Sequence, residues 1–289
     1  MDATLRLRTR PWIWPGLLSL DAPIVAVLWL LLFTRSLRVR VPVTEAAVLA
    51  MAVWLIYVAD RIMDSFRESE RAPLALRHRF YREHRAAFVA PFCGIMLLAA
   101  WMAWTKLDER TLRGGVALAA IVGVYFGVVH LSGSLVQRWF PKELAVAVLF
   151  CAGSCLPVFV RVRGLNTPDI AGFIGFVLVG WMNTALIEYT EWIALRDGGA
   201  EQPSALTIAL ARVIVPLGIA IAALSLIAVA FPSFRDVRPV LLAEAGSALA
   251  LAALSFSWRR ISTYVLRISA DAVLCTPAVL LAVLAFLRR

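Results

Sequence analysis

Two clusters of acidic residues are the part of the sequence best suited to chemistry. The first contains Tyr57, Asp60 and Asp64, whose spacing of three and four residues places them on one face of a helix. Two carboxylates one turn apart repel each other unless a cation lies between them or a base such as Arg61 compensates their charge. The first cluster is therefore a candidate cation site.

The second cluster contains Glu188 and Glu191, with Thr184 on the same helical face, Asn183 before it and Asp197 after it. If the two clusters end helices that face each other across a cavity, they form an oxygen-rich site. Mg²⁺ prefers such carboxylate, water and phosphate oxygens. The two clusters together therefore predict a magnesium site.

A basic segment from Arg77 to Arg85 follows the first cluster. Its arginines, Arg77 and Arg79 among them, are suited to bind phosphate oxygens beside a metal ion. Arginines that follow a membrane span also hold lipid headgroups, and this second interpretation stays open. The segment therefore indicates either a phosphorylated ligand or a membrane anchor.

The composition identifies the solvent in which these residues must be positioned. Of 289 residues, 61% are hydrophobic and only 17% are charged, with a mean hydropathy of +0.81. A soluble domain draws roughly a quarter of its residues from the charged types. The net charge of +10 would suit nucleic acid in a polar chain, but here the basic residues lie between apolar runs. We therefore expect an integral membrane protein that binds lipid headgroups and no nucleic acid.

Apolar runs of the right length predict the architecture. A hydrocarbon core of about 30 Å needs about 20 mostly apolar residues per helix. By this measure the sequence predicts an all-α, polytopic protein with nine transmembrane helices in one bundle, a cytoplasmic-side cavity and a single domain over residues 1–289. The predicted spans are 17–34, 43–59, 86–104, 114–131, 143–160, 169–187, 205–230, 239–257 and 270–287.

The distribution of basic residues predicts the orientation. Arginines concentrate in the connection 61–85, which favours that side as cytoplasmic. The amino terminus and both acidic clusters are then cytoplasmic and the carboxyl terminus is external. No small-residue cleavage site follows Phe33, so the first span is read as retained rather than as a signal peptide. We expect the protein in a bacterial plasma membrane.

Three further acids lie near or within predicted spans, namely Asp21, Glu244 and Asp271. Acidic side chains at membrane depth cost roughly 2.5–3.5 kcal/mol on insertion scales, so each needs a partner. We interpret these three as partners between helices rather than as groups that do chemistry.

The span count and the acidic clusters resemble the UbiA-type superfamily of intramembrane prenyltransferases. The first motif of that family reads Asn-Asp-x-x-Asp-x-x-x-Asp. Asp60 and Asp64 match its last two acids, while Ile56 and Tyr57 occupy the positions of the leading Asn-Asp. The resemblance covers residues 17 to 287 in length, span count and order of motifs.

Later motifs of the family are matched in part. Tyr125 corresponds to a tyrosine after the fourth span, with His130 in one of the two basic positions that follow it. Lys142 and Glu143 match a Lys-Glu pair that opens the fifth helix. Glu188, Glu191 and Asp197 occupy the region of the second acidic motif, with glutamates in place of aspartates.

The resemblance implies a function and a set of site residues. It implies Mg²⁺-dependent transfer of a prenyl group from an isoprenyl diphosphate to an unidentified lipophilic acceptor. Asp60, Asp64, Glu191 and Asp197 would hold the metal and act in catalysis, with Glu188 as an alternative ligand. The implied substrate-binding residues are Tyr57, Arg61, Arg77, Arg79, Tyr125, His130, Lys142 and Asn183.

Other functions remain open at this point. A family member that has lost catalysis would act as a lipid or isoprenoid binder or transporter. A membrane phosphotransferase also ends its signature in spaced aspartates, but it needs Asp-Gly and Ala-Arg elements that Tyr57-Val58-Ala59 does not supply. A secondary transporter would place its charges near the midplane in paired halves, whereas these acids cluster at one rim.

Overall fold

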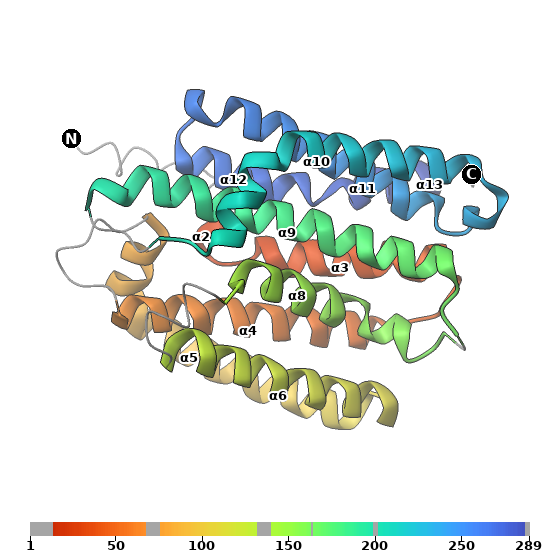
Figure 1. Ribbon diagram of the computed structural model, residues 1–289. Coiled ribbons are helices and arrows are strands. Elements are labelled where there is room, and N and C mark those ends of the chain that lie inside the picture. The colour runs from red at the N-terminus through yellow and green to blue at the C-terminus, as the bar shows by residue number, and fades with distance from the viewer. Residues whose placement is uncertain (1–13, 68–75, 132–139, 163, 199–201, 287–289) are drawn as a thin grey trace.

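The computed structural model describes residues 14–67, 76–131, 140–162, 164–198 and 202–286, and within these ranges it contains helices and no strand (Figure 1). The α-helices are α2 (Trp14–Leu17), α3 (Asp21–Ser36), α4 (Val43–Arg67), α5 (Leu76–Lys106), α6 (Glu109–Leu131), α8 (Lys142–Phe159), α9 (Thr167–Leu195), α10 (Ala205–Ala230), α11 (Arg238–Ser257), α12 (Thr263–Val273) and α13 (Thr276–Phe286). Three single turns of 3₁₀ helix follow α9, α10 and α11. The prediction of an all-α protein is confirmed.

Eight segments of the described chain are long and apolar enough to cross a membrane. They are Val43–Met63, Ala86–Lys106, Glu109–His130, Lys142–Phe159, Thr167–Leu195, Ala205–Ala230, Arg238–Arg260 and Thr263–Phe286. Large apolar side chains on their outer faces are exposed, for example Leu97 and Trp104 on α5, Val124 on α6 and Leu224 on α10. Such a surface suits lipid rather than water, so the chain is a polytopic membrane protein.

The first predicted span, 17–34, differs from the structure because the helix is broken before Asp21. Ser19 has a φ of 56° and separates α2 from α3, which leaves α3 with 16 residues. The carbonyls of Gly16 and Leu18 accept hydrogen bonds from Arg61 Nη1 at 2.7 Å and Trp54 Nε1 at 2.9 Å. These side chains from α4 satisfy the carbonyls that the break exposes, as membrane depth requires.

The last predicted span, 270–287, begins earlier in the structure and is also broken. It consists of α12 and α13, which meet at Leu274 and Cys275 and together run from Thr263 to Phe286. The Leu274 carbonyl accepts a hydrogen bond from Trp29 Nε1 at 2.9 Å. The break is therefore stabilised in the same way as the first one, by an indole N–H from a neighbouring helix.

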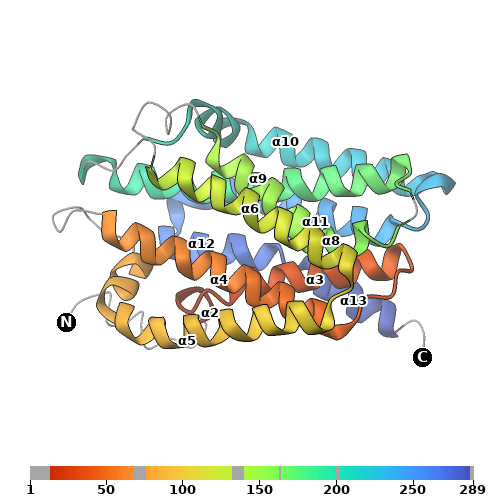
Figure 2. The ribbon, with the colours of Figure 1, turned by 90° about the horizontal axis from the view of Figure 1, so that it is seen from below.

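The helices run side by side, with α3, α8 and α9 in the middle of the bundle (Figures 1 and 2). Here Trp29 stacks on Phe176 at 4.1 Å between ring centroids, and Phe33 stacks on Phe173 at 4.7 Å. Helices α4 and α5 pack together on one side of this core, and α10 and α11 pack together on the other. Helix α6 packs against α8 and presents most of its surface outward.

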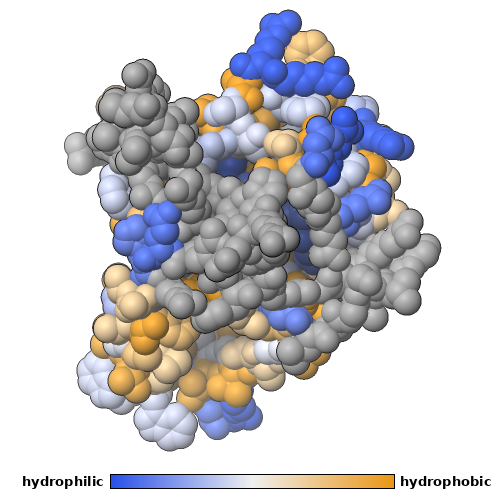
Figure 3. Space-filling view, turned by 90° about the vertical axis from the view of Figure 1, so that its left-hand side faces the viewer, coloured by the Kyte–Doolittle hydropathy of each residue, from blue (hydrophilic) through white to orange (hydrophobic). Residues whose placement is uncertain are grey.

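Alternating helix directions bring both acidic clusters to one end of the bundle, which we call the site end. The carboxyl-terminal parts of α4, α6 and α9 meet the amino-terminal parts of α3, α8 and α12 there. Figure 3 looks onto this end and shows hydrophilic side chains gathered on it. Glu45 and Arg161 mark the opposite end, where α4 begins and α8 has just ended.

Candidate functional site

A cavity of about 250 Å³ opens at the site end between α3, α4, α6, α8, α9 and α12. Among its lining residues are many polar side chains: Asp21, Tyr57, Asp60, Tyr125, Lys142, Glu143, Asn183, Thr184, Glu188, Arg267 and Asp271. Six of the residues predicted from the sequence are therefore brought to one cavity. These six are Tyr57, Asp60, Tyr125, Lys142, Asn183 and Glu188.

Lys142 and Glu188 join the beginning of α8 to the end of α9. Lys142 Nζ lies 2.8 Å from Glu188 Oε1, and both side chains are partly buried. An unpaired charge is unfavourable in such a partly buried position, and the glutamate offsets the charge of the lysine. The pair places one cation and one carboxylate on the same wall of the cavity.

Arg267 is the second cation of the cavity and reaches it from α12. Its Nη1 lies 3.0 Å from Glu191 Oε1, and its Nε lies 4.0 Å from Asp271 Oδ2. Asn183 Nδ2 donates to the carbonyl of Ala270 at 3.2 Å and to Asp271 Oδ1 at 3.4 Å. These contacts lock α12 against α9 and fix the position of the guanidinium.

Asp60 connects α4 to α6 through His130. His130 Nε2 lies 3.5 Å from Asp60 Oδ1, and the histidine side chain is 3% exposed against 43% for the aspartate. The carboxylate is thus open to the cavity on one side and contacts the imidazole on the other. His130 lies beside the cavity rather than in its lining, since it stacks on Phe126, which does line it.

Glu143 is a buried acid in the wall of the cavity. It occupies the first turn of α8, where the helix dipole favours a negative charge. Its Oε2 accepts a hydrogen bond from Thr207 Oγ1 of α10. Glu143 therefore ties α8 to α10 while it faces the polar cavity.

Besides His130, three predicted site residues lie outside the cavity lining. Arg61 is 3% exposed, donates to the Gly16 carbonyl and lies 5.7 Å from the ring centroid of Tyr81. Glu191 is held by Arg267 outside the lining. Asp197 follows the end of α9 in a 3₁₀ turn, with its side chain 99% exposed.

Three more predicted residues are described only by their backbone. Asp64 lies in the last turns of α4, and Arg77 and Arg79 lie in the first turns of α5. The side chains of these three fall outside the described residues. Their predicted roles as metal and phosphate ligands stay predictions.

The sequence analysis did not assign Asp21, Arg267 or Asp271 to the site, although all three line the cavity. One signal for two of them is present in the sequence. Arg267 and Asp271 are four residues apart at the start of a long apolar run, so they share a helical face. Asp21 offers no such signal, because only the break before α3 brings it to the cavity.

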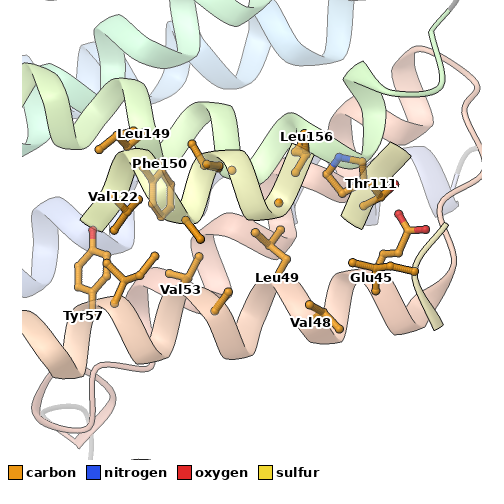
Figure 4. Close-up of a pocket in the computed structure, with 18 of the residues that line it drawn as sticks. Glu45, Val48, Leu49, Val53, Tyr57, Thr111, Val122, Leu149, Phe150 and Leu156 are labelled. Atoms are coloured by element: carbon orange, nitrogen blue, oxygen red, sulfur yellow. The ribbon is translucent and has the colours of Figure 1, made fainter. Parts of the chain in front are cut away.

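An apolar groove of about 200 Å³ continues from the cavity toward the opposite end of the bundle. It runs between α4, α6 and α8, and it shares Ile56, Tyr57, Tyr125, Val146 and Phe150 with the polar cavity. Its other polar side chains are only Glu45 and Thr111, at its far end. Figure 4 shows Tyr57 and Glu45 at the two ends of the groove.

The polar cavity suits a Mg²⁺ ion that takes one protein carboxylate and completes its coordination with water and phosphate oxygens. Among the described residues no group of three His, Cys, Asp or Glu side chains is arranged to hold a metal ion by itself. Mg²⁺ usually takes only one or two protein carboxylates and fills its other positions with water and substrate phosphates. Asp60, which is partly exposed in the cavity, fits that use.

The geometry suits a ligand with a charged head and a long apolar tail. Lys142 and Arg267 supply donors for an anionic head, and the groove supplies an apolar channel for the tail. Comparison of the chain with protein families, with curated proteins and with solved structures gave no match. The geometry of this site is therefore the basis for the proposed function.

Proposed function

We propose that the protein is a membrane-embedded prenyltransferase of the UbiA type, which transfers a prenyl group from an isoprenyl diphosphate to a lipophilic acceptor. The observation that carries this proposal is the junction of a polar cavity and an apolar groove inside one helix bundle, through five shared residues. An isoprenyl diphosphate has the same two-part character. The site end would face the cytoplasm, as the arginine-rich connection 61–85 favours.

The diphosphate would lie in the polar cavity. Lys142 and Arg267 would bind its oxygens through charge-assisted hydrogen bonds, which are the strong type for phosphate. Both cations already face carboxylates, Glu188 at 2.8 Å and Glu191 at 3.0 Å, which hold them in place before the ligand arrives. Such preorganisation reduces the ordering cost of binding.

Asp60 would hold a magnesium ion in the cavity, with Asp64 and Glu188 as further candidate ligands. Bound Mg²⁺ would neutralise negative charge on the departing diphosphate. The role of the chain is to present an accessible carboxylate and phosphate-binding cations in one cavity. Asp60 meets this requirement because its side chain is 43% exposed and lines the cavity.

The reacting carbon would lie at the junction of the cavity and the groove. Breaking its bond to the diphosphate oxygen leaves an allylic carbocation, which the acceptor then attacks with loss of a proton. Tyr57 and Tyr125 lie at this junction and can stabilise a cation through their ring faces. The apolar groove excludes water, which would otherwise consume the cation.

A second candidate function is an isoprenoid or lipid binder without turnover. The observation that favours it is the pairing of the acids with cations in the described site. Glu188 is bound by Lys142 and Glu191 by Arg267, so neither carboxylate is committed to a metal. Such a protein would bind the same class of ligand without needing Mg²⁺.

Binding of a non-reactive donor tests both candidates. We would measure the affinity of the purified protein in detergent for a geranylgeranyl thio-diphosphate analogue, with Mg²⁺ and then with EDTA. The prenyltransferase proposal expects Mg²⁺-dependent binding that falls at least tenfold in Asp60→Asn and in Asp64→Asn. Asp236→Asn is the matched control, because Asp236 is an exposed acid at the opposite end of the bundle.

The outcomes separate the candidates. Equal binding with Mg²⁺ and EDTA, unchanged in Asp60→Asn, would favour the binder and contradict the metal role of Asp60. Binding under neither condition would refute both candidates. If Mg²⁺-dependent binding is found, release of diphosphate from geranylgeranyl diphosphate on addition of aromatic acids, quinone precursors or lipids identifies the acceptor class.

A further inference from the structure

We propose that the groove holds the prenyl tail of the donor and that an ion cluster at its far end limits this tail to about four isoprene units. This inference rests on the prenyltransferase proposal. The cluster consists of Glu45 on α4, Asp108 and Thr111 where α6 begins, and Arg161 after α8. We call it the clasp. The channel length follows from about 1.5 Å of rise per helical residue.

The groove follows one face of each of three helices. On α4 the lining residues are Glu45, Val48, Leu49, Ala52, Val53, Ile56 and Tyr57, which recur at helical spacing. On α6 the lining runs from Thr111 to Tyr125, and on α8 from Val146 to Pro157. The three faces therefore line one continuous groove rather than separate pockets.

The clasp closes the far end of this channel. Arg161 Nη1 donates to Glu45 Oε2 at 2.9 Å, and Arg161 Nη2 lies 2.5 Å from Glu45 Oε1, so the pair is bidentate. Arg161 Nη2 also lies 2.6 Å from Asp108 Oδ2, and Nη1 donates to the Pro157 carbonyl at 2.9 Å. The Glu45 side chain is only 2% exposed.

A hydrophobic tail cannot open this cluster without a large penalty. Separating Arg161 from Glu45 would leave a buried carboxylate without its partner, and an unpaired buried charge is strongly unfavourable. Asp108 is held in turn by the backbone N–H of Thr111 at 3.0 Å and its hydroxyl at 2.8 Å. The clasp therefore acts as a rigid polar wall across three helix ends.

The length of the channel determines how many isoprene units it can hold. Tyr57 and Glu45 are twelve residues apart on α4, which corresponds to about 18 Å. An isoprene unit contributes four main-chain bonds of about 1.5 Å and advances about 4–5 Å when extended. About four units therefore fill the distance from the reacting carbon near Tyr57 to the clasp.

A glycine in the wall, Gly115, allows the channel to be shortened. Gly115 lines the groove, and a Cβ built there would meet Leu156 Cδ2 at 4.0 Å, an ordinary contact. A leucine at this position would fill the groove one turn before the clasp. Gly123 lies on the same helix outside the groove with open space around it, so Gly123→Leu is the matched control.

The test is competitive binding of thio-diphosphates with two, three, four and eight isoprene units to the full chain in detergent with Mg²⁺. We expect the eight-unit probe to bind at least tenfold more weakly than the four-unit probe. In Gly115→Leu the four-unit probe should weaken at least tenfold while the three-unit probe changes less than threefold. Gly123→Leu should behave like the unaltered chain.

A second variant opens the clasp. Glu45→Ala combined with Arg161→Ala removes both charges, so neither is left buried alone. It should bring the eight-unit probe within about threefold of the four-unit probe. If this variant does not fold, Gly115→Leu still tests whether the tail reaches the end of the groove, because it adds volume there without altering the clasp.

Failure of the length limit can be distinguished from failure of the prenyltransferase proposal. Equal affinity for all four probes in the unaltered chain, with no effect of Gly115→Leu, would overturn the clasp as a length limit and leave the prenyltransferase proposal intact. Binding of none of the probes would overturn the prenyltransferase proposal, and the length limit with it.

Discussion

Replacement of Arg61 by methionine tests whether this arginine supports the fold or binds a ligand. The resemblance to prenyltransferases predicts a contact with the diphosphate. In the structure the side chain is 3% exposed and points to the break between α2 and α3, away from the cavity lining. The two roles predict opposite results for stability and binding.

The expected loss of stability follows from the contacts of Arg61. Its hydrogen bond to the Gly16 carbonyl is 2.7 Å long, and a hydrogen bond to a charged group contributes about 1.5–3 kcal/mol. Its cation–π contact with Tyr81 at 5.7 Å adds about 0.5–1 kcal/mol. Removal of the charge also relieves its desolvation, so we expect a net loss of about 2–3 kcal/mol.

Thermal unfolding in detergent, followed by tryptophan fluorescence, measures this loss. Arg61→Met should lower the midpoint by roughly 4–10 °C, while diphosphate binding per folded molecule stays within threefold. The control Arg113→Met removes an arginine of α6 that is 71% exposed, and it should change stability by less than about 0.5 kcal/mol. An unchanged midpoint in Arg61→Met, together with lost diphosphate binding, would refute the structural role.

Two further substitutions test the packing and electrostatics outside the cavity. Gly175→Ala should destabilise the protein by about 1–3 kcal/mol, because a Cβ there would collide with the buried carboxyl group of Glu244, and Glu244→Ala in the same chain should recover part of the loss. The hydrogen bonds from Thr111 hold the pKa of Asp108 below its usual range. Asp108 therefore contributes stability above its unfolded pKa of about 3.9 that is lost as the pH falls through its lower folded value. Asp108→Asn lacks this contribution at every pH, so its thermal midpoint should approach that of the unaltered chain as the pH falls below about 4.

Gly175→Ala has a matched control variant, and each of the two substitutions has a result that would contradict its prediction. Gly123→Ala adds a methyl group where a Cβ would meet nothing within 4 Å, and it should stabilise α6 by up to about 1 kcal/mol. A Gly175→Ala protein as stable as the unaltered chain would contradict the close contact with Glu244. For Asp108, a difference in midpoint that is the same at pH 3 and pH 7 would contradict the lowered pKa.

Much of the fold was predictable because hydrophobicity is a local property of the chain. Runs of about 20 apolar residues identified the spans that correspond to α4, α5, α6, α8, α9, α10 and α11. The predictions for the first and last spans of the chain, 17–34 and 270–287, did not anticipate breaks in these helices. A break becomes favourable only where another helix supplies a donor, as Trp54 and Trp29 do for Leu18 and Leu274.

The candidate site was predictable in part for the same reason. Helical spacing placed Tyr57 with Asp60 and Thr184 with Glu188, and the alternation of spans placed both pairs at one end of the bundle. The partners of these residues were not predictable. Arg267 reaches Glu191 across 76 positions in the sequence, and no local pattern connects them.

The sequence by itself determined that this chain lies in a membrane as helices and that its two acidic clusters lie at one end of the bundle. Both conclusions depend on composition and on helical period, which neighbouring residues define. Only the tertiary structure decided which acids are paired, that Arg61 supports a broken helix, and that an apolar groove leads from the cavity to the clasp of Glu45 and Arg161. These features depend on which helices pack together, because a buried charge or a free carbonyl takes its partner from whichever helix lies beside it.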